Sequence, residues 1–130
     1  MMQAHVVASL PYEACGLLAG VDSEVRQVFP ITNQLQSPVR YRMAPSEQVR
    51  AFATIESIGM ELVAIYHSHT AAAGTVGAAM AQPSATDIAE AAYAVVQVLW
   101  SRIRGPWQAD GYWITGKCVR KIALEIKDAG

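Results

Sequence analysis

The chain has 130 residues, of which 52% are hydrophobic and 16% are charged, and its formal net charge is −1. This balance is typical of one globular domain and excludes an intrinsically disordered chain. Because no basic block occurs, neither nucleic acid nor an anionic membrane is expected as the main partner. The longest apolar run, Ala91 to Trp100, is too short to span a membrane, and no signal peptide is evident, so we expect a cytoplasmic protein.

The N-terminal third of the chain predicts a helix followed by a hairpin. Residues 2–9 are expected to be helical, and Pro11 ends this helix. The apolar segment Cys15–Gly20 predicts a central strand, and the alternating segment Val25–Phe29 predicts its hairpin partner. Val39–Met43 alternates in the same way, which predicts a further strand.

A second helix and a buried strand are expected next. Pro45 opens a segment with apolar residues at close to helical spacing, and Gly59 closes it. The run Leu62–Tyr66 predicts a buried strand. The stretch Thr70–Gln82 is rich in alanine and glycine and predicts a long loop, of a kind that is usually functional or mobile.

The remaining third predicts one helix and three strands. The helix is expected from Pro83 to about Ala92, and the strands at Tyr93–Trp100, Ala109–Thr115 and Cys118–Ile126. Helices that lie between strands indicate an α/β or α+β class with a mixed central sheet flanked by helices. We expect a single domain over residues 1–130, and the sequence does not fix its oligomeric state.

Two cysteines, Cys15 and Cys118, lie far apart in apolar surroundings, and no CxxC motif occurs. This arrangement predicts two buried free thiols in a reducing compartment.

The segment Tyr66-His67-Ser68-His69 contains two of the three histidines in the chain. Side chains alternate across a strand, so His67 and His69 point to the same face and could form half of a metal site. The alternative is a pair of hydrogen-bonded core histidines. A catalytic zinc usually keeps three protein ligands, and two histidines with one carboxylate are a common set.

Asp87 is the candidate third ligand, because a strand–loop–helix unit returns its helix start to the end of its own strand. Glu90 is the nearest competitor, one turn further along the predicted helix. The pattern from Ser84 to Asp87 also matches a capping box, in which Asp87 only supports the helix start. The two roles can coexist.

Glu13 is the candidate general base, since a carboxylate directly before the apolar strand at Cys15 is poorly explained by packing. The alternative for Glu13 is a solvated turn residue. His5, on the first predicted helix, is expected on the surface.

Three segments together resemble the JAMM/MPN+ zinc metallopeptidases, and more closely their small stand-alone bacterial and archaeal members. The segments are Pro11-Tyr12-Glu13-Ala14-Cys15-Gly16-Leu17-Leu18-Ala19-Gly20, Tyr66-His67-Ser68-His69 and Pro83-Ser84-Ala85-Thr86-Asp87. Two departures stand out. Thr70 replaces a proline that usually follows the second histidine, and the gap from that histidine to the serine is longer than in the family.

The resemblance implies a cytidine-deaminase-like central sheet and one Zn²⁺ per chain, held by His67, His69 and Asp87. It implies Glu13 as general acid and base, and Ser84 as the donor that stabilises the oxyanion. The implied reaction is hydrolysis of an amide or isopeptide bond, near the C-terminus of a ubiquitin-like or sulfur-carrier protein or in a short peptide.

Two other functions are alternatives to a zinc-dependent hydrolase. A non-catalytic binding scaffold of the same fold is the main alternative, although such proteins typically lose ligands that this chain keeps. A nucleoside deaminase would need a His-x-Glu motif and a Pro-Cys-x-x-Cys motif, and neither occurs.

Overall fold

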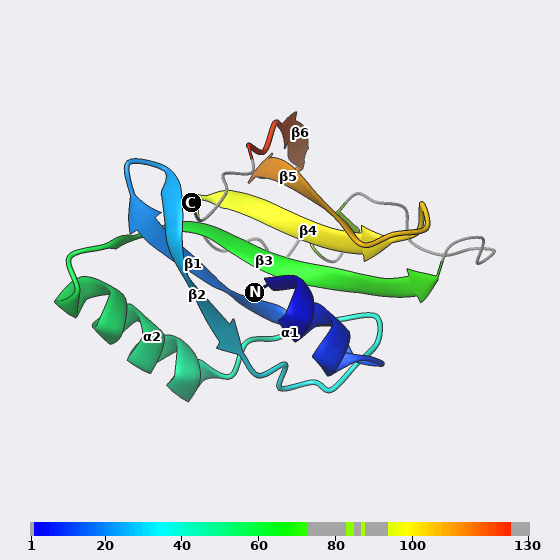
Figure 1. Ribbon diagram of the computed structural model, residues 1–130, viewed down its shortest axis with the longest axis horizontal. Helices are drawn as coiled ribbons and strands as arrows, with labels where there is room; N and C mark the ends of the chain where they lie inside the picture. The colour runs from blue at the N-terminus through cyan, green and yellow to red at the C-terminus, as the bar shows by residue number, and fades with distance from the viewer. Residues whose placement is uncertain (1, 73–82, 85–86, 88–93, 126–130) are drawn as a thin grey trace.

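A computed structural model of the protein describes residues 2–72, 83–84, 87 and 94–125. Six strands form one sheet in the order β2-β1-β3-β4-β5-β6, and its neighbours are antiparallel except for the parallel pair β3 and β4 (Figure 1). The expected α+β class with a mixed sheet is therefore confirmed. The elements are α1 (Met2–Ser9), β1 (Cys15–Val21), β2 (Glu24–Ile31), α2 (Pro45–Ser57), β3 (Glu61–Ala72), β4 (Val96–Arg102), β5 (Gln108–Thr115) and β6 (Cys118–Ile122).

The strands β1 and β3 are buried on both faces, which explains their nearly continuous apolar sequence. On one face Leu17 and Ile65 belong to a core with Ile55 of α2. On the opposite face Leu18 and Tyr66 belong to a second core, against which Met2 of α1 packs. The two helices therefore cover opposite faces of the sheet. Within the described residues, no helix is long and apolar enough to cross a membrane.

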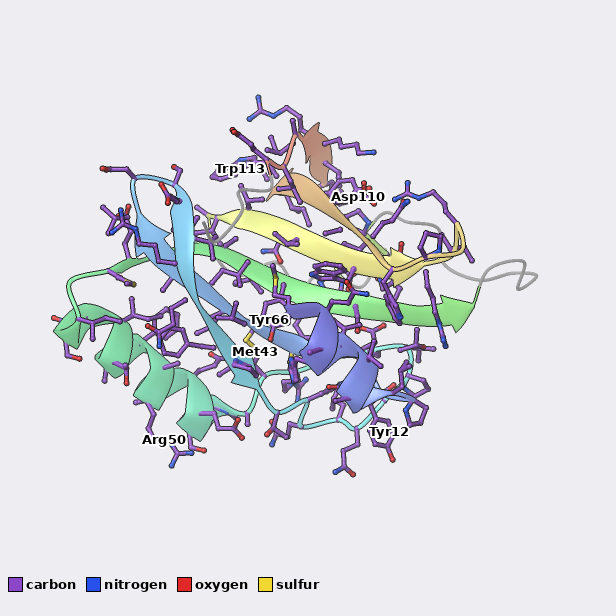
Figure 2. All side chains as sticks on the ribbon, in the orientation of Figure 1. Tyr12, Met43, Arg50, Tyr66, Asp110 and Trp113 are labelled. Atoms are coloured by element: carbon purple, nitrogen blue, oxygen red, sulfur yellow. The ribbon has the colours of Figure 1, made fainter. Side chains whose placement is uncertain are left out.

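The second helix begins and ends close to its expected bounds. Pro45 occupies its first turn, where a missing N–H costs nothing. At its end, Gly59 has a φ of 72°, a left-handed conformation that glycine adopts without steric cost. The N–H of Met60 donates to the carbonyl of Ile55 and completes the cap. In Figure 2, Arg50 points outward from this helix.

The expected strand at Val39–Met43 is wrong. Only Met43 forms an isolated bridge, with Asn33. In a strand, Val39 and Met43 would share one face, but Met43 is buried while Val39 is 72% exposed. Instead, the loop closes on the side chain of Asn33, which accepts a hydrogen bond from the N–H of Arg42. A side-chain partner here replaces the ladder that a strand would need.

Several bounds in the C-terminal half also differ from expectation. Strand β3 continues to Ala72, so the start of the predicted loop is strand, and residues 73–82 lie outside the described part of the chain. Strand β4 is displaced toward Arg102, and β6 ends at Ile122. Most of the helix predicted from Pro83, including Glu90, is likewise outside the described residues.

The prediction of two buried thiols holds for Cys15 and is wrong for Cys118, which is exposed. Its strand β6 lies at the edge of the sheet and is exposed along almost its whole length. The apolar-looking sequence of β6 is therefore left exposed at the edge of the sheet.

The prediction that His5 lies on the surface is also wrong. His5 is half-buried, and its Nδ1 is 2.7 Å from the hydroxyl of Tyr66. Tyr66 is fully buried beside α1 (Figure 2), and a Cβ atom on Gly16 would lie only 2.3 Å from the Tyr66 ring. Glycine at position 16 thus admits this ring between β1 and α1. The contact anchors the strand that also carries His67.

Candidate metal centre

Strand pairing brings the Glu13 segment to the two histidines. In the antiparallel pair β1 and β3, Cys15 lies opposite His67. The ladder continues one step further, because the N–H of Ser68 donates to the carbonyl of Ala14 and the N–H of Ala14 donates to Ser68 Oγ. Residues opposite each other share a face of the sheet, so Glu13 lies on the same face as His67 and His69.

The structure brings His67, His69 and Asp87 together at the end of β3. The Nε2 atoms of both imidazoles lie 3.0 Å from the same oxygen, Oδ2 of Asp87. The candidate ligand atoms of the three residues all lie within 4.8 Å of one another. The three side chains are buried or nearly so, with exposed fractions of 1%, 5% and 8%. Two imidazole nitrogens and a carboxylate oxygen, converging on one point, match the donor set and open geometry of a catalytic zinc site.

Asp87 is held in its ionised form despite its burial. Desolvation alone would raise its pKa, but the hydrogen bonds from His67 and His69 outweigh this and hold the pKa well below its usual range. An ionised carboxylate is the form that binds a cation.

Ser84 and Asp87 also form the capping box predicted from their spacing. The N–H of Ser84 donates to Asp87 Oδ2 over 2.9 Å, and the N–H of Asp87 donates to Ser84 Oγ over 3.0 Å. Asp87 therefore has both the geometry of a capping residue and that of a candidate metal ligand. Because Ser84 Oγ acts here as an acceptor, its hydroxyl hydrogen is left for another partner.

Glu13 is not a solvated turn residue. Its side chain is 3% exposed, and its Oε1 atom has no hydrogen-bond partner among the described residues. Burial, followed by the negative charge of Asp87, raises its pKa from 4.5 to about 8. A carboxyl group that titrates near neutral pH and faces a cluster of ligands is suited to proton transfer.

This raised pKa predicts a pH-dependent stability of the metal-free protein. Below pH 4.5 Glu13 is protonated in both the folded and the unfolded chain, so its contribution is complete there. Between this value and about 8 only the unfolded chain releases the proton, so stability falls with rising pH. We expect chelator-treated wild type to lose roughly 3 kcal/mol more than Glu13→Gln between pH 5 and 8.5, measured by urea unfolding. Parallel pH profiles for the two proteins would contradict this.

The family described as prokaryotic homologs of the JAB domain matches residues 1–115. The chain belongs to this family.

Relatives of this JAB-domain chain include named peptidases. A desampylase of Pyrococcus furiosus is 42% identical over 66 residues, which are 51% of this chain and 47% of the relative. The CysO-cysteine peptidase of Mycobacterium tuberculosis is 39% identical over 89 residues, which are 67% of this chain and 56% of the relative. A probable TtuB-protein conjugate cleaving protease of Thermus thermophilus is 37% identical over 99 residues, 75% of this chain and 62% of the relative. The matched region thus spans about half to three-fifths of these relatives.

Solved structures support the same fold. The solution structure of a protein from Desulfitobacterium hafniense superposes with a TM-score of 0.82 at 29% identity, covering 97% of this chain and 86% of that one. A protein from Salinibacter ruber superposes with a TM-score of 0.64 at 25% identity, covering 98% and 88%.

The segment 33–43, here named the Asn33 loop, lies against one side of the candidate metal centre. The Asn33 amide donates to the carbonyls of Glu13 and Arg40, each over 3.0 Å. Its Oδ1 accepts from the N–H groups of Leu35 and Arg42. From this loop, the ring of Tyr41 stacks on His67, with centroids 4.7 Å apart and planes at 23°.

The sequence patterns did not predict that Asn33 and Tyr41 lie at the candidate site. A polar loop and an alternating segment carried no signal that they would return to the histidine strand.

Thr70, where the sequence departs from the family pattern, connects this loop to β3. Its hydroxyl donates to the carbonyl of Pro38 over 3.0 Å. Its own carbonyl accepts two hydrogen bonds from the guanidinium of Arg102, which lies 5.3 Å from the centre of the Trp107 ring. Proline has no side-chain donor, so the threonine supplies a contact that the usual family residue cannot.

Proposed function

We propose that this chain is a zinc-dependent peptidase or isopeptidase that uses His67, His69 and Asp87 as metal ligands. The proposal depends on one observation. Two imidazole nitrogens and a carboxylate oxygen converge at a buried point, beside Glu13, whose Oε1 atom has no hydrogen-bond partner among the described residues. Buried polar groups are normally paired, so this arrangement is better explained by a ligand than by packing.

His67, His69 and Asp87 would hold the zinc, which when bound would supply a Lewis acid for the scissile carbonyl and lower the pKa of water. Glu13 is placed to accept a proton from the attacking water and to pass it to the leaving amine. Its raised pKa would fall again beside a divalent cation, since a nearby opposite charge favours the ionised form. Ser84 is placed to donate its hydroxyl hydrogen to the negative charge that develops on the carbonyl oxygen.

The substrate that we propose is the C-terminal amide or isopeptide bond of a ubiquitin-like or sulfur-carrier protein, or of a short peptide. The support comes from the names of the relatives, which include a CysO-cysteine peptidase, desampylases and a protease that cleaves TtuB-protein conjugates. Addition of water across the amide yields a free carboxylate on the carrier and a free amine on the departing group.

Hydrolysis of such a conjugate is the direct test. We expect the metal-replete protein to release a ubiquitin-like carrier from a C-terminal fusion, with both products identified by mass spectrometry. Treatment with a chelator should lower the rate by at least about 100-fold, because the Lewis acid is lost, and added Zn²⁺ should restore it. Full activity after complete metal removal would contradict the proposal.

A further inference from the structure

The ring of His67 has an unusual environment for a metal ligand. Ligating histidines almost always donate their second ring nitrogen to a carboxylate, a carbonyl or water, which fixes the orientation of the ring. Here Nε2 faces Asp87, and Nδ1 is buried without a hydrogen-bond partner among the residues that the structure describes. Among the described residues, no protein group therefore makes the usual orienting contact to this side chain.

Another contact takes its place. Tyr41 lies nearly parallel to the imidazole, with centroids 4.7 Å apart and planes at 23°. An offset stack of this kind restricts rotation about the bond that joins the ring to Cβ, because turning the imidazole would break the face-to-face contact. Cys15 is directly opposite His67 on the neighbouring strand.

Tyr41 is itself held through the Asn33 loop. The Asn33 amide bridges five backbone groups, those of Glu13, Leu35, Ser37, Arg40 and Arg42. These include the residues on both sides of Tyr41. Asn33 is 8% exposed, so few of these bonds could be replaced by water if the side chain were removed.

From these contacts we infer that Tyr41 is a positioning residue for the metal ligand His67, and that Asn33 sets this position by ordering the loop. The inference rests on the proposed metal site. The stacked ring does for His67 what a hydrogen bond to the second nitrogen does in most metal sites. The conformation of the Asn33 loop and the affinity for metal are thereby linked.

Zinc affinity without substrate tests the inference. We expect Tyr41→Ala and Tyr41→Leu to raise the zinc dissociation constant about 10-fold, the size typical of lost orienting contacts. Tyr41→Phe keeps the aromatic plane and should stay within about 2-fold of wild type. Val39→Ala, in the same loop at a side chain that is 72% exposed, is the matched control. The measurement is competition with a chromogenic chelator, made alongside thermal melts of each metal-free variant.

Two results would overturn the inference. One is wild-type zinc affinity in Tyr41→Ala. The other is equal weakening in Tyr41→Phe and Tyr41→Ala, which would assign the effect to the hydroxyl group instead of the stacked ring. Asn33→Ala is a second test of the inference. It should also weaken zinc binding, although none of the Asn33 hydrogen bonds described above reaches the side chain of a metal ligand.

A measurement on metal-free protein separates this inference from the proposed function. The imidazole resonances of His67 should shift in Tyr41→Ala, because the ring current of the tyrosine is lost, and should stay near their wild-type positions in Tyr41→Phe. If wild type binds no zinc, the proposed function fails, and these spectra still decide whether Tyr41 stacks on His67. Unchanged His67 resonances in Tyr41→Ala would exclude the stack and overturn the inference.

Discussion

Glu13→Gln should leave zinc bound at about one ion per chain and lower kcat/KM for a ubiquitin-like fusion by about 10²–10⁴-fold, the range typical of lost general acid–base catalysis. Glutamine has nearly the shape of glutamate and fits the same buried position, but it cannot accept and return a proton. The measurements are zinc content by mass spectrometry and initial rates at several substrate concentrations.

Matched controls make this result specific. Glu56→Gln changes an exposed acid on α2 and should keep the wild-type rate. Glu13→Asp retains a carboxylate that is one methylene shorter, and it should recover part of the lost rate if proton transfer is the role of residue 13. A Glu13→Gln variant that hydrolyses the fusion at the wild-type rate would remove Glu13 from the mechanism.

If wild type itself shows no turnover on any fusion or peptide while binding zinc, the non-catalytic scaffold becomes the better description. Glu13→Gln and wild type would then be indistinguishable in every assay except the pH dependence of stability.

The second large effect is expected at the ligands. Replacing His67 with alanine removes one of three donors and should weaken zinc binding by about 10²–10⁴-fold, so the purified protein would hold far less than one ion per chain. Asp87→Ala should do the same and in addition lose a capping hydrogen bond, because Asp87 Oδ2 also accepts the Ser84 N–H.

Asp87→Asn separates these two roles. The asparagine oxygen can still accept from the Ser84 N–H, but a neutral amide is a much weaker zinc ligand than a carboxylate. We therefore expect this variant to keep the thermal stability of the metal-free protein better than Asp87→Ala does, and to lose zinc to a similar extent. Asp22→Asn, in the exposed turn between β1 and β2, is the control, because asparagine tolerates the positive φ found there. Full zinc occupancy in His67→Ala and Asp87→Asn would refute the ligand assignment.

Much of the candidate site follows from local chemistry in the sequence. Alternation along a strand places His67 and His69 on one face whatever the rest of the chain does. The spacing from Ser84 to Asp87 predicted a capping box, and both of its hydrogen bonds are present. The order of the elements predicted a mixed sheet, which is also confirmed. The zinc ion and the catalytic roles of Glu13 and Ser84 stay predictions.

The failures have a common physical origin. Val39–Met43 alternates as a strand does, but the side chain of Asn33 binds two of its backbone groups, on Arg40 and Arg42. The exposure of His5 was predicted from its helical position alone, whereas it is half-buried and contacts Tyr66, which is distant in the sequence. Cys118 lies in an apolar-looking segment that forms β6, the strand at the edge of the sheet. In each case the deciding partner is elsewhere in the sheet or on another element.

The sequence by itself determined which residues are candidates for the chemistry, because residue type, strand alternation and helix capping act within a few positions along the chain. Only the tertiary structure decided that Asp87 Oδ2 meets both imidazoles at 3.0 Å, that Glu13 is buried with a pKa near 8, and that Tyr41 stacks on His67. Distances, desolvation and ring contacts depend on the register of β1 against β3 and on how the Asn33 loop folds back. Those are set by the packing of the whole sheet and not by any one segment.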